Sequence, residues 1–237
     1  MSKTYKINEI FYSLQGEGIR CGTPNIFVRF SNCNLECRQE AGPKSPGGFD
    51  CDTEFTSGRR LSLNEINDWL INITSDAQVH LTKEWKDKPW LILTGGEPGL
   101  QVDKEFCTYF HNKDFKLAIE TNGSLLLPCE TQMVIAEVLD VDRLPTLLES
   151  FYVDWITVSP KVAEHAIRQP VAHEVKYVRG YGQAIPNTKV QAYHKLISPA
   201  FDGLEPDMSA VNWCIDLVKR HPDWRLSPQV HKLWQVR

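Results

Sequence analysis

Six short apolar runs, separated by segments with helical spacing, constrain the fold of this chain more than any other feature. The runs are rich in β-branched and aromatic residues, and several are apolar on both faces, as buried parallel strands are. They cover residues 25–31, 89–94, 115–120, 154–159, 173–178 and 189–197. Strands that alternate with helices predict βαβ units and a parallel sheet. Because a closed barrel of this kind has about eight strands, six predict an open, barrel-like α/β fold.

Four other segments carry the apolar spacing of amphipathic helices. Ser62 and Glu65 form a Ser-x-x-Glu capping box at the start of the first one. No clear domain boundary is visible along the chain, so we expect a single domain over residues 1–237. The helices are expected over residues 62–73, 102–112 and 207–220 and within 130–150. The helix over 207–220 is expected to bury one apolar face, made of Val211, Cys214, Ile215 and Val218.

Composition narrows the class of protein. Hydrophobic residues make up 42% and charged residues 24% of the chain, which is typical of a globular protein. No apolar run approaches the roughly 20 residues of a membrane helix, and the first ten residues lack the apolar region of a signal peptide. We therefore expect a cytoplasmic protein with no membrane partner. The net charge of −4 argues against a nucleic-acid-binding surface, which needs a basic footprint.

Three of the seven cysteines, Cys33, Cys37 and Cys51, fall in one polar loop after the first strand. Cytoplasmic thiols stay reduced, so this cluster indicates metal binding or chemistry rather than a disulfide. Structural zinc usually takes four ligands, whereas three cysteines can hold an iron–sulfur cluster with one iron left open. The loop alone leaves both alternatives open. Cys107 and Cys214 lie among apolar residues and are expected as small core residues.

Polar motifs follow three more of the predicted strands: "TGGEP" at 94–98, "ETNG" at 120–123 and "SPK" at 159–161. In parallel α/β folds the chemistry lies at these carboxyl ends of strands. Gly95 and Gly96 allow close approach of a ligand to the backbone, and the Glu97 carboxylate can accept from an ammonium group. A plain β-turn is the alternative for this motif on its own.

The cysteine loop and the Gly-Gly-Glu-Pro motif together resemble the radical S-adenosylmethionine superfamily, which favours the iron–sulfur alternative. The superfamily's usual signature is Cys-x3-Cys-x2-Cys. Cys33 and Cys37 match it, but Cys51 follows Cys37 after a longer stretch, which resembles an insertion over residues 38–50. The glycines and prolines of this stretch are typical of a surface bulge.

Within that superfamily the chain resembles the 7-carboxy-7-deazaguanine synthase family over nearly its whole length. The shared motifs are "INEIFYSLQGEG", "RCGTPNIFVRFSNCNLEC", "CDTEF", "LTGGEP", "IETNG", "VSPK" and "WRLSPQVHK". Residues 194–203, "HKLISPAFDG", depart from the Leu-Gln-Pro-Met of many members. The resemblance implies an incomplete, open (β/α)6 TIM-like barrel of the radical S-adenosylmethionine type, with a modified cluster loop.

The resemblance also implies a reaction. A carbon–nitrogen lyase of this family contracts the ring of 6-carboxy-5,6,7,8-tetrahydropterin to give 7-carboxy-7-deazaguanine, with loss of ammonia, in the queuosine pathway of tRNA modification. It implies three cofactors: a [4Fe–4S] cluster, S-adenosylmethionine and Mg²⁺. The implied partners are a second copy of the chain in a homodimer and an electron donor such as flavodoxin.

Site residues carry over from the matching motifs. Cys33, Cys37 and Cys51 would hold the cluster, and Thr53 would hold Mg²⁺. No protein side chain is predicted as a catalytic residue, because the radical comes from S-adenosylmethionine. The residues expected to bind S-adenosylmethionine are Gly95, Gly96, Glu97, Glu120, Asn122, Ser159 and Lys161. Those expected to bind the pterin are Leu14, Gln15, Gly16, Glu17, Arg29, Asp52, Thr94, Gln229 and His231.

Alternatives remain for single residues and for the function of the whole chain. Arg29, flanked by apolar residues, either clamps the substrate carboxylate or forms an internal salt bridge, since a buried guanidinium needs a partner. Gln229 and His231 either close the site or belong to a plain surface tail. For the whole chain, the alternatives are a glycyl-radical-activating enzyme, which the "QGEG" and "CDT" elements disfavour, and a zinc-stabilised binding module without chemistry.

Overall fold

A nine-stranded, mostly parallel sheet organises the protein. The computed structural model describes residues 3–38, 50–51, 53–77, 89–130, 144–202 and 205–236. The sheet has the order β11-β8-β7-β6-β5-β4-β2-β1-β3, and its neighbours are parallel from β2 to β11. β1 runs antiparallel to both β2 and β3. The edge strands β3 and β11 do not pair with each other in the described part of the chain, so the sheet is open there.

The predicted strands are all present. They correspond to β2 (Pro24–Phe30), β4 (Trp90–Gly95), β5 (Leu117–Thr121), β6 (Trp155–Val158), β7 (Val171–Arg179) and β8 (Gln191–Pro199). The sequence missed β1 (Tyr5–Leu14), β3 (Arg59–Leu61) and β11 (Trp224–Leu226). β1 mixes polar and apolar residues because only part of its length is buried, and the other two are too short for a periodicity to show. A separate pair, β9 (Phe201–Asp202) and β10 (Glu205–Pro206), follows β8.

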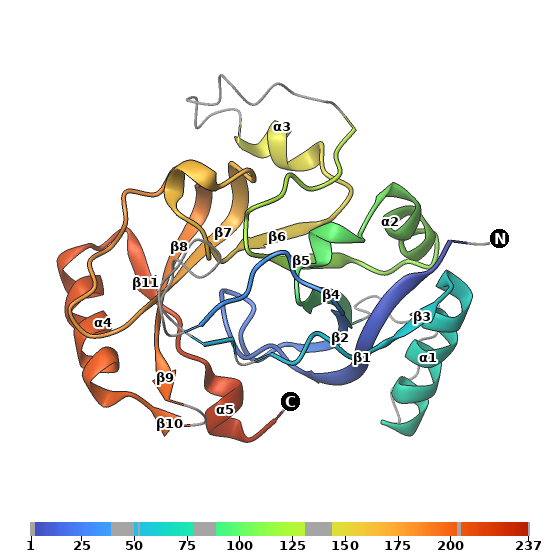
Figure 1. Ribbon diagram of the computed structural model, residues 1–237, viewed down its shortest axis with the longest axis horizontal. Coiled ribbons are helices and arrows are strands. Elements are labelled where there is room, and N and C mark those ends of the chain that lie inside the picture. Colours follow the sequence, from blue (N-terminus) through green and yellow to red (C-terminus); the bar gives the residue numbers. More distant parts are fainter. Residues whose placement is uncertain are drawn as a thin grey trace.

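Four of the described helices lie around the outside of the curved sheet (Figure 1). They are α1 (Leu63–Asp76), α2 (Lys104–His111), α3 (Leu144–Glu149) and α4 (Met208–Arg220). The short helix α5 (Val230–Trp234) lies instead at the open side of the sheet, and the 3-10 turns are η1 (Pro98–Leu100) and η4 (Glu164–Ala166). The capping box is confirmed, because the Ser62 hydroxyl accepts from the backbone of Glu65 while the Glu65 carboxylate accepts from the backbone of Ser62. The helix expected within 130–150 is α3, and residues 131–143 lie outside the described part.

The buried face of α4 differs slightly from the predicted one. Cys214 is fully buried as expected, but its buried neighbours are Ala210 and Leu217, while Val211 and Ile215 are half-buried. The face of α4 that is buried is thus made of Ala210, Cys214 and Leu217, and the helix contacts β8 and β11. Cys107 on α2 is also fully buried, so both cysteines are core residues. None of the described helices has the length and apolar character needed to span a membrane.

The loop that joins β1 to β2 folds into the concave side of the sheet. β1 ends beside the start of β2, with Leu14 opposite Pro24. From there the chain turns inward, so that the side chain of Gln15 reaches Glu120 on β5 and the backbone of Ile19 donates to Glu174 on β7. This loop therefore brings its motif to the carboxyl ends of strands that lie far away in the sequence.

Candidate active site

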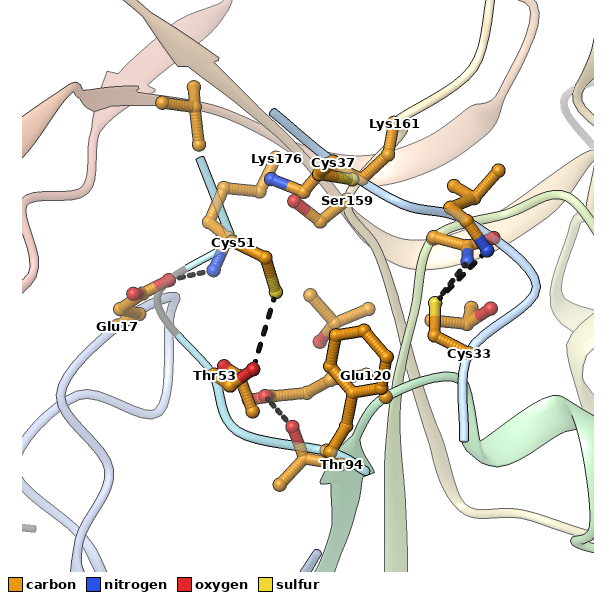
Figure 2. A pocket seen from close by; sticks show the side chains of 18 of the residues that line it. Glu17, Cys33, Cys37, Cys51, Thr53, Thr94, Glu120, Ser159, Lys161 and Lys176 are labelled. Carbon is orange, nitrogen blue, oxygen red and sulfur yellow. Dashed lines mark hydrogen bonds and ion pairs between the residues drawn. The ribbon is translucent and has the colours of Figure 1, made fainter. Parts of the chain in front are cut away.

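The three loop cysteines line a single cavity of about 220 Å³ at the carboxyl ends of β4, β5 and β6. Figure 2 shows Cys33, Cys37 and Cys51 around this cavity together with Ser159, Lys161 and Lys176. The cysteines are free thiols. Since β2 ends at Phe30, the loop begins directly beside the end of β4, where Phe30 pairs with Gly95. We call this space the cysteine cavity.

The Cys33 sulfur accepts hydrogen bonds from its surroundings. The backbone N–H of Leu35 donates to it at 3.4 Å, and the Asn122 amide donates at 3.9 Å. Burial raises the pKa of the Cys33 and Cys37 thiols, while the ammonium of Lys161 acts in the opposite direction on Cys37. A bound metal supplies the positive charge that thiolates need in such a site.

The donor groups around the thiols are of the kind found at iron–sulfur centres. N–H donors to the sulfurs are a feature of such centres. Within the described ranges, no group of three His, Cys, Asp or Glu side chains is arranged to hold a metal ion. The set of three thiols on the walls of one cavity is compatible with the predicted ligands, which remain a prediction.

Gly95 and Gly96 are required by the packing of the chain itself. Gly95 has a φ of +116°, and a Cβ there would lie 2.3 Å from the carbonyl oxygen of Phe30. A Cβ on Gly96 would lie 2.0 Å from the carbonyl oxygen of Asn32. The backbone that approaches these two glycines most closely is thus that of Phe30 and Asn32, at the start of the cysteine loop. Both glycines also line the cysteine cavity, as predicted for a ligand-binding turn.

Glu97 is completely buried and bound by protein groups. Its carboxylate accepts from the Thr121 hydroxyl at 2.8 Å and from the backbone N–H groups of Asn122 and Gly99 at 2.7 and 2.9 Å. Burial raises the pKa of this carboxyl, and the three hydrogen bonds favour its charged form. Glu97 therefore ties the end of β4 to the end of β5. Its expected contact with S-adenosylmethionine remains a prediction.

A second, larger cavity of about 780 Å³ opens next to the first. Each residue predicted to bind the pterin that the structure describes lines it; Asp52 lies outside the described residues. Sequence reasoning missed Phe11 and Phe27, cross-strand partners on β1 and β2 whose rings stack at 5.0 Å on the wall of this cavity. The available signal was the aromatic residue in each of the two strands, although β1 itself was not predicted. We call this space the tail cavity, because residues of the C-terminal segment also line it.

Five residues line both cavities and form their shared boundary: Glu17, Thr53, Thr94, Glu120 and Gln229. Glu120 accepts from the Gln15 amide at 3.0 Å and from the Thr94 hydroxyl at 2.9 Å. Burial raises the pKa of Glu120, and these two donors favour its charged form. Predicted cofactor residues and predicted substrate residues thus meet through direct hydrogen bonds. Asn122, Ser159 and Lys161 lie on the cysteine side of this boundary.

Arg29 forms a salt bridge with Glu9 and also lines the tail cavity. Its guanidinium carbon lies 5.4 Å from the centre of the Phe11 ring. Its Nε has no hydrogen-bond partner among the described residues. Arg29 thus forms the internal salt bridge, and its contact with the substrate carboxylate remains a prediction.

The C-terminal segment packs onto the loop that carries "LQGEG". The backbone N–H of Val230 donates to the carbonyl of Gly16 at 3.0 Å, and the Gln229 amide donates to Glu17 at 2.8 Å. His231 lies against Gly16 so closely that a Cβ there would lie 2.2 Å from the imidazole. The segment is thus part of the cavity wall rather than a plain surface tail.

Comparisons with known proteins agree with the motifs. No family model matches the chain. The curated 7-carboxy-7-deazaguanine synthase of Burkholderia multivorans is 35% identical over 245 residues, covering 98% of this chain and 99% of the relative. The enzyme of the same name from Bradyrhizobium diazoefficiens is 32% identical over 247 residues, covering 99% and 100%. The crystal structure of QueE from Escherichia coli has the same fold, with a TM-score of 0.58 and 22% identity over 95% of this chain and 94% of that one.

Proposed function

The chain belongs to the 7-carboxy-7-deazaguanine synthase family, and from this we propose that it contracts the ring of 6-carboxy-5,6,7,8-tetrahydropterin to 7-carboxy-7-deazaguanine. Ammonia leaves in this reaction, so the enzyme is a carbon–nitrogen lyase. It acts by radical S-adenosylmethionine chemistry and serves 7-deazapurine and queuosine biosynthesis.

The observation that carries this proposal is the boundary shared by the two cavities. Thiols suited to a cluster lie on one side, and an arginine with an aromatic wall lies on the other. A cofactor held in the cysteine cavity and a substrate held in the tail cavity would lie next to each other at the boundary that includes Thr94 and Glu120. The tail cavity has the size and mixed polar and aromatic lining typical of small-molecule sites.

The cofactors fit residues of this chain. Cys33, Cys37 and Cys51 would hold a [4Fe–4S] cluster, whose open iron binds S-adenosylmethionine, and this pair supplies a 5′-deoxyadenosyl radical when bound. Asn122, Ser159 and Lys161 would orient the nucleoside cofactor at the rim of the same cavity. Thr53, on the boundary, is the proposed Mg²⁺ ligand, since a hydroxyl oxygen suits this hard cation.

Side chains of the tail cavity would hold the substrate. Arg29 would pair with the pterin carboxylate, because a guanidinium matches a carboxylate with two parallel hydrogen bonds. Gln15 and Glu17 would bind the N–H and carbonyl groups of the pyrimidine ring, and Phe11 and Phe27 give an apolar wall for a flat ring. Gln229 and His231 would exclude water by closing the tail side.

Further parts of the proposal concern shape and partners. We retain an incomplete barrel of the radical S-adenosylmethionine type as the description of the curved sheet, a homodimer as the assembly, and a flavodoxin-like protein as the electron donor. The open sheet order and the helices on its outer side support the first of these.

Anaerobic turnover of synthetic 6-carboxy-5,6,7,8-tetrahydropterin with reductant and S-adenosylmethionine tests the function. Formation of 7-carboxy-7-deazaguanine and ammonia in equal amounts is the expected result. An absorbance band near about 400 nm after anaerobic purification distinguishes an iron–sulfur protein from a zinc-stabilised module. A brown protein that cleaves S-adenosylmethionine but leaves the pterin unchanged would point to another radical enzyme on this scaffold.

A further inference from the structure

Lys176 on β7 forms an ion pair with Glu17, and nothing in the sequence motifs marked this lysine. Both side chains are largely buried, with 12% and 14% of their surfaces exposed. Figure 2 shows Lys176 and Glu17 at the cysteine cavity. Glu17 also lines the tail cavity. The pair therefore lies inside the site, at the boundary where cofactor and substrate residues meet.

Two residues on the same face of β7 hold the loop that contains Glu17. Glu174 and Lys176 are two apart in the strand, so their side chains point to the same side of the sheet. Glu174 accepts from the backbone of Ile19 at 2.9 Å and from the Thr157 hydroxyl at 2.7 Å. Glu174 thus anchors the loop backbone, and Lys176 contacts the functional side chain of the same loop.

The Glu17 carboxylate is fixed from two directions. One oxygen pairs with the Lys176 ammonium, and the other accepts from the Gln229 amide at 2.8 Å. An ionised carboxylate can accept about four hydrogen bonds, so these two contacts leave room for a bidentate ligand. The pyrimidine ring of a pterin presents adjacent N–H donors of this kind.

A buried carboxylate and a buried ammonium are each costly without a counter-charge. Burial lowers the pKa of Lys176 to about 8. The ion pair supplies the counter-charge that each of the two side chains needs.

We propose that Lys176 is a positioning residue for substrate recognition: it pairs with Glu17 and, with Gln229, orients the Glu17 carboxylate toward the N–H donors of the pterin. This inference rests on the proposed function, because it takes the pterin as the substrate of the tail cavity. It assigns Lys176 to the substrate rather than to S-adenosylmethionine, although the lysine lines the cysteine cavity.

The test compares the reconstituted wild-type enzyme with Lys176→Met, Lys176→Arg and the control Lys195→Met. Lys195 lies on the neighbouring strand β8 and pairs with Asp223 at 3.0 Å in a much more exposed position. We expect Lys176→Met to raise the KM for the pterin by about 30-fold, as the loss of one partner of a desolvated pair does. Uncoupled cleavage of S-adenosylmethionine and its KM should stay at the wild-type level. Lys176→Arg should recover part of the loss, and Lys195→Met should match the wild type.

A double-mutant cycle shows whether Lys176 acts through Glu17. In the Glu17→Gln background, Lys176→Met should cost no further affinity, since no carboxylate is left to position. This double variant also strands no buried charge, so it keeps the comparison valid if Lys176→Met alone folds poorly. The proposal would be overturned if the two substitutions raise the KM for the pterin independently, so that the double variant shows the product of the two single effects. A raised KM for S-adenosylmethionine in Lys176→Met would also overturn it. A KM for the pterin that is unchanged in Lys176→Met, measured when the wild-type enzyme is active, would also overturn it. A wild-type enzyme that cannot turn over the pterin at all would instead refute the proposed function.

Discussion

The backbone N–H of Cys51 donates a hydrogen bond to the carbonyl oxygen of Cys37, at 3.2 Å. This bond brings the two cysteines on either side of residues 38–50 back to the same point. The spacing between Cys37 and Cys51 along the sequence therefore does not separate them in space. A family spacer of two residues would place them in the same neighbourhood.

Replacing residues 38–50 with a two-residue spacer should consequently leave a protein that binds a cluster and keeps some activity. The expected iron and sulfide content after reconstitution equals that of the wild type. The prediction is wrong if the shortened protein folds, as judged by circular dichroism, but binds no iron. Residues 38–50 would then be needed to form the cluster site.

Single replacements of the three loop cysteines should each abolish the cluster. Cys33→Ala, Cys37→Ala and Cys51→Ala remove a thiolate from the wall of the cysteine cavity. Cys107→Ala is the control, because that cysteine is fully buried against the core and touches neither cavity. Iron and sulfide analysis measures the outcome. Full cluster content in Cys51→Ala would show that Cys51 is not the third ligand.

Arg29→Met should weaken pterin binding by about 2–5 kcal/mol, the usual loss when one partner of a desolvated charge pair is removed. Uncoupled cleavage of S-adenosylmethionine should persist. Stability should fall by only about 1 kcal/mol, because the Arg29–Glu9 pair is partly exposed, with 28% and 22% of its side chains accessible.

Glu9→Gln is the matched control for the clamp, since it breaks the same salt bridge from its other end. Pterin affinity should survive in this variant. If Arg29→Met and Glu9→Gln instead lower the melting temperature and the pterin affinity equally, Arg29 acts as an internal salt bridge and not as a clamp.

Glu97→Gln should destabilise the fold by about 2–4 kcal/mol, because an amide cannot accept all three hydrogen bonds and turns a donor toward other N–H groups. Denaturant unfolding of the apoprotein measures this loss. Glu65→Gln is the control: glutamine also completes a capping box, so the change there should stay within about 1 kcal/mol. Equal losses in the two variants would contradict the structural role of Glu97.

His173 should make stability fall in mild acid. Burial lowers its pKa from 6.5 to about 4, and its Nδ1 accepts from the backbone N–H of Ile156 at 3.0 Å. As the pH falls from 6.5 toward 4, the unfolded chain binds a proton that the folded chain does not, so folding stability is lost across this window. Because His173 is partly exposed, we expect about 1 kcal/mol between neutral pH and about pH 5.

The variant His173→Asn keeps an acceptor near Nδ1 but does not titrate, so its stability should fall less over the same range. Asp154 and His194 also shift the pKa of His173, and both residues are present in the wild type and in His173→Asn. The exposed His221→Asn should behave as the wild type does. If His173→Asn loses as much stability in acid as the wild type does, His173 is not the cause of the loss.

The central strands and most helices follow from local sequence patterns alone. β2, β4, β5 and β6 are short apolar runs whose residues are mostly buried, so their composition alone marks them as strands of a covered sheet. The capping box of α1 is equally local, since it needs only Ser62 and Glu65. The motifs at strand ends also identified the family, because residue types at fixed spacing need no tertiary information.

Which of these residues come into contact depends on the tertiary structure. The strict need for Gly95 comes from the backbone of Phe30, and the carboxylate of Glu17 is held by Lys176 and Gln229, which lie far along the chain. β11 exists because a parallel neighbour, β8, supplies its hydrogen bonds. Such contacts depend on how the curved sheet brings distant segments together, and no local pattern of three or four residues carries that information.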